Sequence, residues 1–267
     1  MTKRQKFVLG SVLLATGFFA IQFLDFSYRY SSIGGFILFS LLVSFFALKE
    51  GLGRNATLLT LVLPVFFAAG TQLFYLGLEN SGFFTSLSPT LRLGLRLILV
   101  TAYTLGAYAL FLTSNIYTVA AARTIQLLRA AHAVGFLLTL VVAFFIFNAI
   151  FSLRLDFWVN GLVAVLASTP LFLQGFWSID LEHTVSKNVL YTSIGLSLLV
   201  GQMAAMLSFW PITVVVGSLA VTTVLYAGLG LGQANLQQRL FEKTIREYLI
   251  VGAVVFATMF LTASWGG

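Results

Sequence analysis

Long apolar runs separated by short polar segments make up most of this chain. There are nine such runs, each near the roughly 20 residues that a helix needs to cross a hydrocarbon core of about 30 Å. They are continuously apolar, whereas the strands of a transmembrane barrel would alternate polar and apolar positions. The pattern predicts an all-α fold, a polytopic transmembrane helix bundle that forms one integral membrane domain over residues 1–267. The predicted spans are 7–25, 33–48, 57–78, 93–113, 133–151, 157–176, 188–207, 211–231 and 248–264.

The composition supports this membrane location. Hydrophobic residues make up 59% of the chain and charged residues only 9%, which is too little charge to hydrate the surface of a soluble protein of this size. The chain has no Cys, so disulfides, thiolate metal sites and Cys nucleophiles are excluded.

Two longer segments between spans are predicted to be cytoplasmic helices. They are 114–132 and 232–247, and neither contains Gly or Pro after its first residue. The first is expected to follow a turn at Thr113, Ser114 and Asn115. The second is expected to continue without a break into the last span.

The distribution of Lys and Arg gives an orientation, because loops on the cytoplasmic side of a membrane retain positive charge. With the N-terminus inside, only Arg29, Arg92, Arg96 and Arg154 of the 15 basic residues fall on the outer side. The sequence therefore predicts an N-inside, C-outside topology in the inner or plasma membrane of the cell. The net charge of +7 reflects this bias, and no basic run is long enough to follow the phosphates of a nucleic acid.

Short internal echoes suggest a degenerate repeat, a feature common in transporters. One set, offset by five spans and therefore inverted, pairs Thr71, Tyr75 and Gly77 with Thr222, Tyr226 and Gly228. A competing set, offset by four spans and therefore parallel, pairs Asn115, Arg123 and Thr124 with Asn235, Lys243 and Thr244. Coincidence is the third explanation, because the chain is rich in Leu, Ala and Gly.

Arg92 and Arg96 are the sharpest candidates for a binding site. They lie four residues apart and so project from one face of the fourth predicted helix. Two guanidinium groups on one face can bind a phosphate or carboxylate through paired hydrogen bonds. The competing interpretation is that both side chains extend to the headgroups or pair with Glu79 and Asp25.

Amides are the main polar groups inside the predicted spans. We expect four of them to line a path for a polar solute: Gln22, Gln72, Gln174 and Gln202. The alternative is that these side chains form hydrogen bonds between neighbouring helices. We expect no buried Asp, Glu or Arg in the span interiors, which disfavours proton relays and voltage sensors.

Catalytic, metal and cofactor sites are not predicted. The best metal candidates, Asp180, Glu182 and His183, lie in one loop, and His132 is far from them in the sequence. No G-x-S-x-G motif occurs and neither His lies in a span, so a Ser hydrolase is disfavoured.

Three functional hypotheses follow from these patterns. The first is a carrier or permease for a small anionic or lipidic solute, with no catalytic role. The second is a membrane scaffold or assembly factor, which would present basic helices to anionic lipid headgroups or to protein partners of unknown identity through Arg123, Arg129, Arg239 and Arg246. The third is a lipid-modifying enzyme, which the lack of acid, base and metal residues disfavours.

Overall fold

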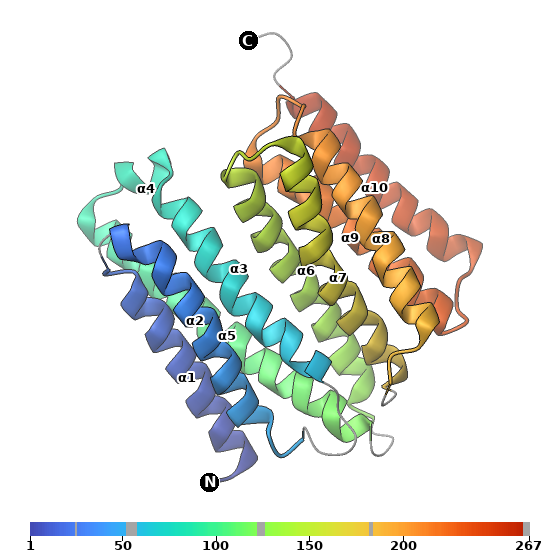
Figure 1. Cartoon of the computed structure of the whole chain (residues 1–267), viewed down its shortest axis with the longest axis horizontal. Coiled ribbons are helices and arrows are strands. Elements are labelled where there is room, and N and C mark those ends of the chain that lie inside the picture. The colour runs from blue at the N-terminus through green and yellow to red at the C-terminus, as the bar shows by residue number, and fades with distance from the viewer. Residues whose placement is uncertain (25, 52–57, 122–125, 182–183, 264–267) are drawn as a thin grey trace. The chain divides into compact units, whose positions relative to one another are not determined.

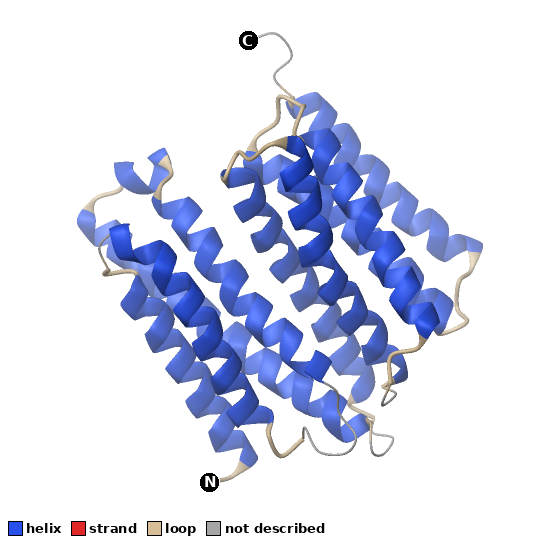
Figure 2. Ribbon diagram, in the orientation of Figure 1, coloured by secondary structure: helices blue, strands red, loops and turns tan. Residues whose placement is uncertain are grey.

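The computed structural model describes residues 1–24, 26–51, 58–121, 126–181 and 184–263, and these ranges are helical and contain no strand (Figures 1 and 2). The described elements are α1 (Lys3–Ile21), α2 (Phe26–Leu48), the 3₁₀ helix η1 (Leu58–Leu61), α3 (Val62–Glu79), α4 (Gly82–Ser86), α5 (Pro89–Ala120), α6 (Leu128–Ser152), α7 (Phe157–Asp180), α8 (Lys187–Leu207), α9 (Val214–Leu236) and α10 (Glu242–Thr262). Among them are nine segments long and apolar enough to cross a membrane, which confirms the prediction of a polytopic helical membrane protein.

The predicted turn at residues 113–115 is wrong, because α5 continues through it to Ala120. The helix starts at the N-cap Ser88 with Pro89 in its first turn, a favourable arrangement, and no Gly or Pro interrupts it between residues 107 and 120. The hydroxyls in this part bond to carbonyl oxygens: Thr118 donates to Asn115 at 2.8 Å and Ser114 to Thr60 at 3.2 Å. The polar side chains are therefore satisfied without a break in the helix.

The predicted continuous helix over 232–247 is also wrong, because it is divided between two elements. Helix α9 ends at Leu236 and α10 begins at Glu242, from which it continues into the last span as expected. Between them Gln238 has a φ of 56°, and the Arg239 amide donates to the Ala234 carbonyl at 2.8 Å. A residue in the left-handed conformation ends a helix. Because that residue is usually Gly or Asn, a Gln at this position does not predict a helix end from the sequence.

The chain forms two compact units, Met1–Leu138 and Thr139–Gly267. In the first unit α1 packs against α2 and α5, and α3 packs against α2 and α5. Its centre is aromatic: the ring of Tyr103 stacks on Phe18 at 4.9 Å and on Phe67 at 5.1 Å between centroids. All three side chains are almost completely buried, so large rings fill this unit.

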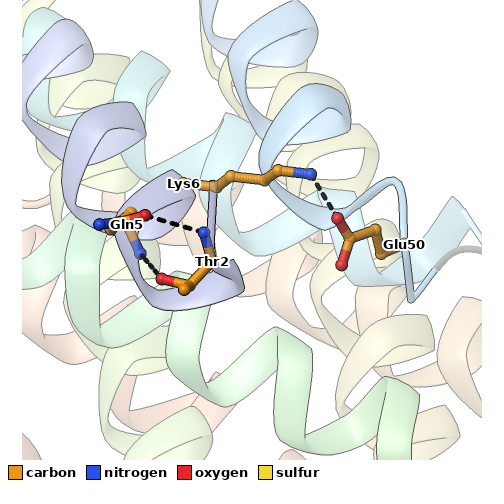
Figure 3. A network of polar contacts seen from close by, with 4 residues as sticks. All are labelled: Thr2, Gln5, Lys6 and Glu50. Atoms are coloured by element: carbon orange, nitrogen blue, oxygen red, sulfur yellow. Dashed lines mark hydrogen bonds and ion pairs between the residues drawn. The ribbon is translucent and has the colours of Figure 1, made fainter.

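Polar contacts tie the start of α1 to the end of α2 (Figure 3). Thr2 and Gln5 form a capping box, in which each side chain accepts a hydrogen bond from the other's backbone amide. One turn later the Lys6 ammonium donates to the Glu50 carboxylate. This hydrogen bond holds the pKa of Glu50 below its ordinary value.

In the second unit α7 and α8 approach closely through small residues. A Cβ atom built on Gly201 would lie 2.7 Å from the carbonyl oxygen of Gly161, so a larger residue could not fit without movement. Helices in membranes commonly associate through such small residues, since the hydrophobic effect does not drive them together. Helix α9 packs against α7, α8 and α10, and within its described length α10 buries only Met259.

Candidate functional site

The strongest candidate site surrounds Arg96 near the start of α5. Its Nε donates to the hydroxyl of Tyr75 at 3.0 Å, and its Nη2 donates to Oε1 of Glu79 at 2.9 Å. The side chains of Arg96 and Glu79 are 19% and 13% exposed, so the ion pair is largely removed from solvent. Tyr75 and Glu79 lie one turn apart on α3, and the guanidinium group therefore joins α3 to α5 through two fixed points.

Two aromatic rings lie near the Arg96 guanidinium. Its central carbon lies 5.3 Å from the ring centroid of Phe23 and 5.8 Å from that of Phe84. The buried Tyr75 ring meets Phe84 edge-on at 6.2 Å. Cation–π attraction and partial burial strengthen the charge interactions of Arg96 here.

Arg92 lies one turn before Arg96 on α5, as expected, but has a different role. Its Nε donates to the Leu87 carbonyl at 2.9 Å and its Nη2 to the Thr85 carbonyl at 2.6 Å. These bonds satisfy carbonyl oxygens at the end of α4, the short helix that places Phe84 over Arg96. Glu79 is thus the partner of Arg96, whereas Asp25 lies outside the described residues.

Buried polar atoms lie deeper in the same unit. Phe18 connects them to the Arg96 site, because its ring meets Tyr75 at 5.8 Å and Tyr103 at 4.9 Å. The Tyr103 hydroxyl and the Gln72 Oε1 have no hydrogen-bond partner among the described residues, although both residues are almost completely buried. Unmade hydrogen bonds are costly in such a place, which marks both groups as candidates for contact with a ligand or water.

The four predicted glutamines are divided between the two units. Gln22, directly after α1, and Gln72, on α3, are buried in the first unit. In the second unit Gln174 is buried on α7, and its Oε1 has no partner among the described residues. Gln202 is exposed on α8. A common lining role for all four stays a prediction.

The basic residues proposed for partner or lipid contact are at the surface where they are described. Arg129 is exposed at the start of α6, Arg239 between α9 and α10, and Arg246 on α10. Arg123 lies outside the described residues, as do Glu182 and His183 of the weak metal candidate. Among the described residues no three His, Asp or Glu side chains are grouped closely enough to hold a metal ion.

A comparison with protein families finds a match over residues 47–262, most of the chain. The chain belongs to the DUF5656 family. The family's description is of proteins of unknown function, so membership assigns no activity. No curated protein and no solved structure matches the chain. The region shared with DUF5656 contains Tyr75, Glu79 and Arg96, whereas Phe18 and Phe23 precede it.

Sequence patterns identified Arg96 and its partner Glu79 in this DUF5656 protein but missed most of the surrounding site. Tyr103 is one aromatic residue within an apolar run, and nothing in the sequence indicates that its hydroxyl is buried. Phe84 belongs to α4, a helix of five residues that is too short to give a periodic pattern. The one sequence feature that pointed to Tyr75 was its match with Tyr226 in the possible inverted repeat.

Proposed function

We propose that this protein is a carrier or permease for a small anionic or lipidic solute, whose anionic group binds Arg96 in place of Glu79. The observation that carries the proposal is the largely buried Arg96–Glu79 ion pair, whose guanidinium group also contacts Phe23, Phe84 and Tyr75. A guanidinium group is the preferred partner of carboxylates and phosphates, because its planar fork donates two parallel hydrogen bonds.

Exchange of the anion is chemically simple in this arrangement. Glu79 supplies a carboxylate that neutralises Arg96 while no solute is bound. An incoming anion of similar geometry replaces one charge-assisted hydrogen bond with another, so the buried cation never remains unpaired. The Glu79 carboxylate would then need solvent or another donor, which links solute binding to a movement of α3 relative to α5.

The unpartnered polar atoms of Tyr103 and Gln72 support a path for the solute from Arg96 into the first unit. An unsatisfied buried hydrogen-bonding group costs about 1–3 kcal/mol. The hydroxyl of Tyr103 and the amide oxygen of Gln72 are both in this condition among the described residues. A polar solute that accepts from Tyr103 or donates to Gln72 would recover part of this cost, whereas a purely structural core would favour Phe and Leu at these positions.

The proposed topology is N-inside and C-outside in the inner or plasma membrane, with an inverted repeat. The division into two units within α6 supports the repeat, as does the mutual packing within α1–α3 and within α7–α9. Carriers commonly place such repeats on either side of a central binding site.

The test is ligand-dependent thermal unfolding of the purified protein. Inorganic phosphate, dicarboxylates, phosphate monoesters and neutral sugars would be added separately to the native chain, Arg96→Ala, Arg96→Lys and Glu79→Gln. A ligand at about 100 times its dissociation constant should stabilise the protein by roughly 2.7 kcal/mol. We expect an anion to stabilise the native chain, to act at lower concentration on Glu79→Gln, and to have no effect on Arg96→Ala.

The lysine variant is the matched control, since it keeps the charge but not the planar fork, and it should bind the same anion more weakly. Stabilisation of Arg96→Ala equal to that of the native chain would contradict the proposal. Equal concentration dependence in Glu79→Gln and the native chain would exclude the exchange mechanism.

A second candidate, a membrane scaffold, rests on the exposed positions of Arg129, Arg239 and Arg246. Basic side chains near a membrane surface attract anionic headgroups by about 1 kcal/mol each. The scaffold predicts that Arg239→Gln with Arg246→Gln impairs cellular function, whereas Arg96→Ala does not. The carrier predicts the reverse.

A further inference from the structure

The second unit contains a separate apolar pocket between α8, α9 and α10, three neighbouring helices in Figure 1. Its volume is about 510 Å³, within the range of roughly 300–1,000 Å³ of typical ligand sites. Leu196, Leu199 and Phe256 are among its walls. Thr223 contributes a hydroxyl that already donates to the Leu219 carbonyl at 2.8 Å. The lining therefore suits a hydrocarbon ligand better than a polar one.

Small residues line the apolar pocket on α9 and α10. Gly228 lines the pocket on α9, and Gly252 with Ala253 line it on α10. A Cβ atom built on Gly252 meets no atom within 4 Å, so this part of α10 faces open volume. Leu196, Val224 and Gly252 of the lining lie near the middle of three candidate membrane spans, where the surroundings are lipid acyl chains.

One end of the pocket is formed by a tyrosine. Tyr248 lines the pocket there, and its ring lies 4.8 Å from that of Tyr226. One residue beyond the pocket along α9, Gly232 begins a smaller hollow whose lining includes Asn188, Thr192 and Asn235. Tyrosine is typical of the boundary between hydrocarbon and headgroups, so this end is expected at the membrane surface.

The charges at this end of α8, α9 and α10 are mostly positive. The described basic residues are Lys187, Arg239, Lys243 and Arg246, against the acidic residues Glu242 and Glu247. All six are exposed. The apolar pocket thus ends beside a surface that attracts anions.

We propose that this pocket holds one acyl chain of an anionic phospholipid, with the headgroup among Lys187, Lys243 and the amides of the smaller hollow. The chain matches the apolar lining, and the negative headgroup matches the excess of basic side chains. This resident lipid lies wholly within the second unit, so it does not depend on the carrier function or on Arg96.

Native mass spectrometry of the purified full-length protein tests the proposal. Phosphatidylglycerol and phosphatidylcholine with identical acyl chains would be titrated against the native chain, Gly252→Leu and Gly195→Leu. Gly195 is a matched control, because it lies on α8 outside the pocket and a Cβ there also meets nothing within 4 Å. We expect one phosphatidylglycerol to be retained by the native chain and by Gly195→Leu, and about tenfold weaker retention by Gly252→Leu, whose side chain fills the space.

If basic side chains bind the headgroup, the native chain should retain phosphatidylcholine more weakly than phosphatidylglycerol. The proposal also predicts that Lys187→Gln with Lys243→Gln removes the preference for phosphatidylglycerol. Equal retention by Gly252→Leu and Gly195→Leu, or no preference between the two lipids in the native chain, would overturn the proposal. Arg96→Ala should retain the lipid normally, which separates a failure here from a failure of the carrier.

Discussion

At the scale of single residues, Arg96 has a geometry that an ordinary surface arginine lacks. Two of its nitrogens bond to different side chains of α3, and two phenylalanine rings lie near its guanidinium group. An exposed arginine that extends to lipid headgroups would keep many conformations, whereas this one is held in a single orientation. Such preorganisation lowers the entropy cost of binding an anion.

Tyr103→Phe gives a residue-scale prediction. The substitution removes a hydroxyl that has no partner among the described residues and preserves the stacked rings around it. We expect the free energy of unfolding of the purified variant to equal that of the native chain or to exceed it by up to about 1 kcal/mol, because a desolvation cost disappears. Solute binding, measured by ligand-dependent unfolding, should weaken.

Tyr108→Phe on the same helix is the control for Tyr103→Phe, because Tyr108 is partly exposed. It should change neither stability nor binding. A clear loss of stability in Tyr103→Phe would show that the hydroxyl makes a hydrogen bond in the folded protein, and this would contradict its proposed role in solute contact.

At the scale of helices, the contact between α7 and α8 depends on glycine. We expect Gly201→Ala to destabilise the protein by about 1–3 kcal/mol, because the new methyl group would overlap the Gly161 carbonyl and the Val165 side chain. Gly195→Ala on the same helix is the control, and it should be neutral or stabilising since its site is open. Thermal unfolding of both variants measures the difference, and equal unfolding temperatures would refute the close packing.

The apolar runs predicted the membrane helices well because hydrocarbon imposes a length and a composition that few soluble segments share. Their ends were less predictable. Helix α9 ends just before Gln238, whose backbone adopts the left-handed conformation. Helix α5 continues past Ser114, whose hydroxyl donates to the Thr60 carbonyl in another segment. Tertiary packing supplies the second of these facts, whereas the first involves the local hydrogen bond from Arg239 to Ala234.

The candidate site was predictable to the extent that it depends on charge. Arg96 and Glu79 stand out in the sequence because charged residues are rare at such positions in a membrane protein. The aromatic surroundings were not predictable, since 27 Phe residues give no indication of which rings enclose the guanidinium. Phe23 approaches it from the turn after α1 and Phe84 from α4, and this arrangement is a property of the packed unit.

At the scale of the whole molecule, the absence of cysteine in the native chain makes the proposed orientation directly testable. Leu153→Cys and Thr184→Cys would introduce single thiols at exposed positions in loops assigned to opposite sides. In intact cells, a membrane-impermeant maleimide should label Leu153→Cys. Thr184→Cys should react only after permeabilisation, because its loop is predicted to be cytoplasmic. Labelling of Thr184→Cys but not Leu153→Cys in intact cells would indicate the reverse topology. Labelling of both variants in intact cells would contradict the proposed placement of the two loops on opposite sides.

Solute flux in proteoliposomes tests the carrier function most directly. Vesicles containing the native chain, Arg96→Ala or no protein would be loaded separately with radiolabelled phosphate, a dicarboxylate, a phosphate monoester or glycerol, and efflux would be followed over time. We predict that at least one anion leaves the native vesicles faster than the protein-free ones, that Arg96→Ala abolishes this difference, and that glycerol efflux is the same in all three. Native vesicles that release every anion no faster than protein-free vesicles would contradict the carrier function.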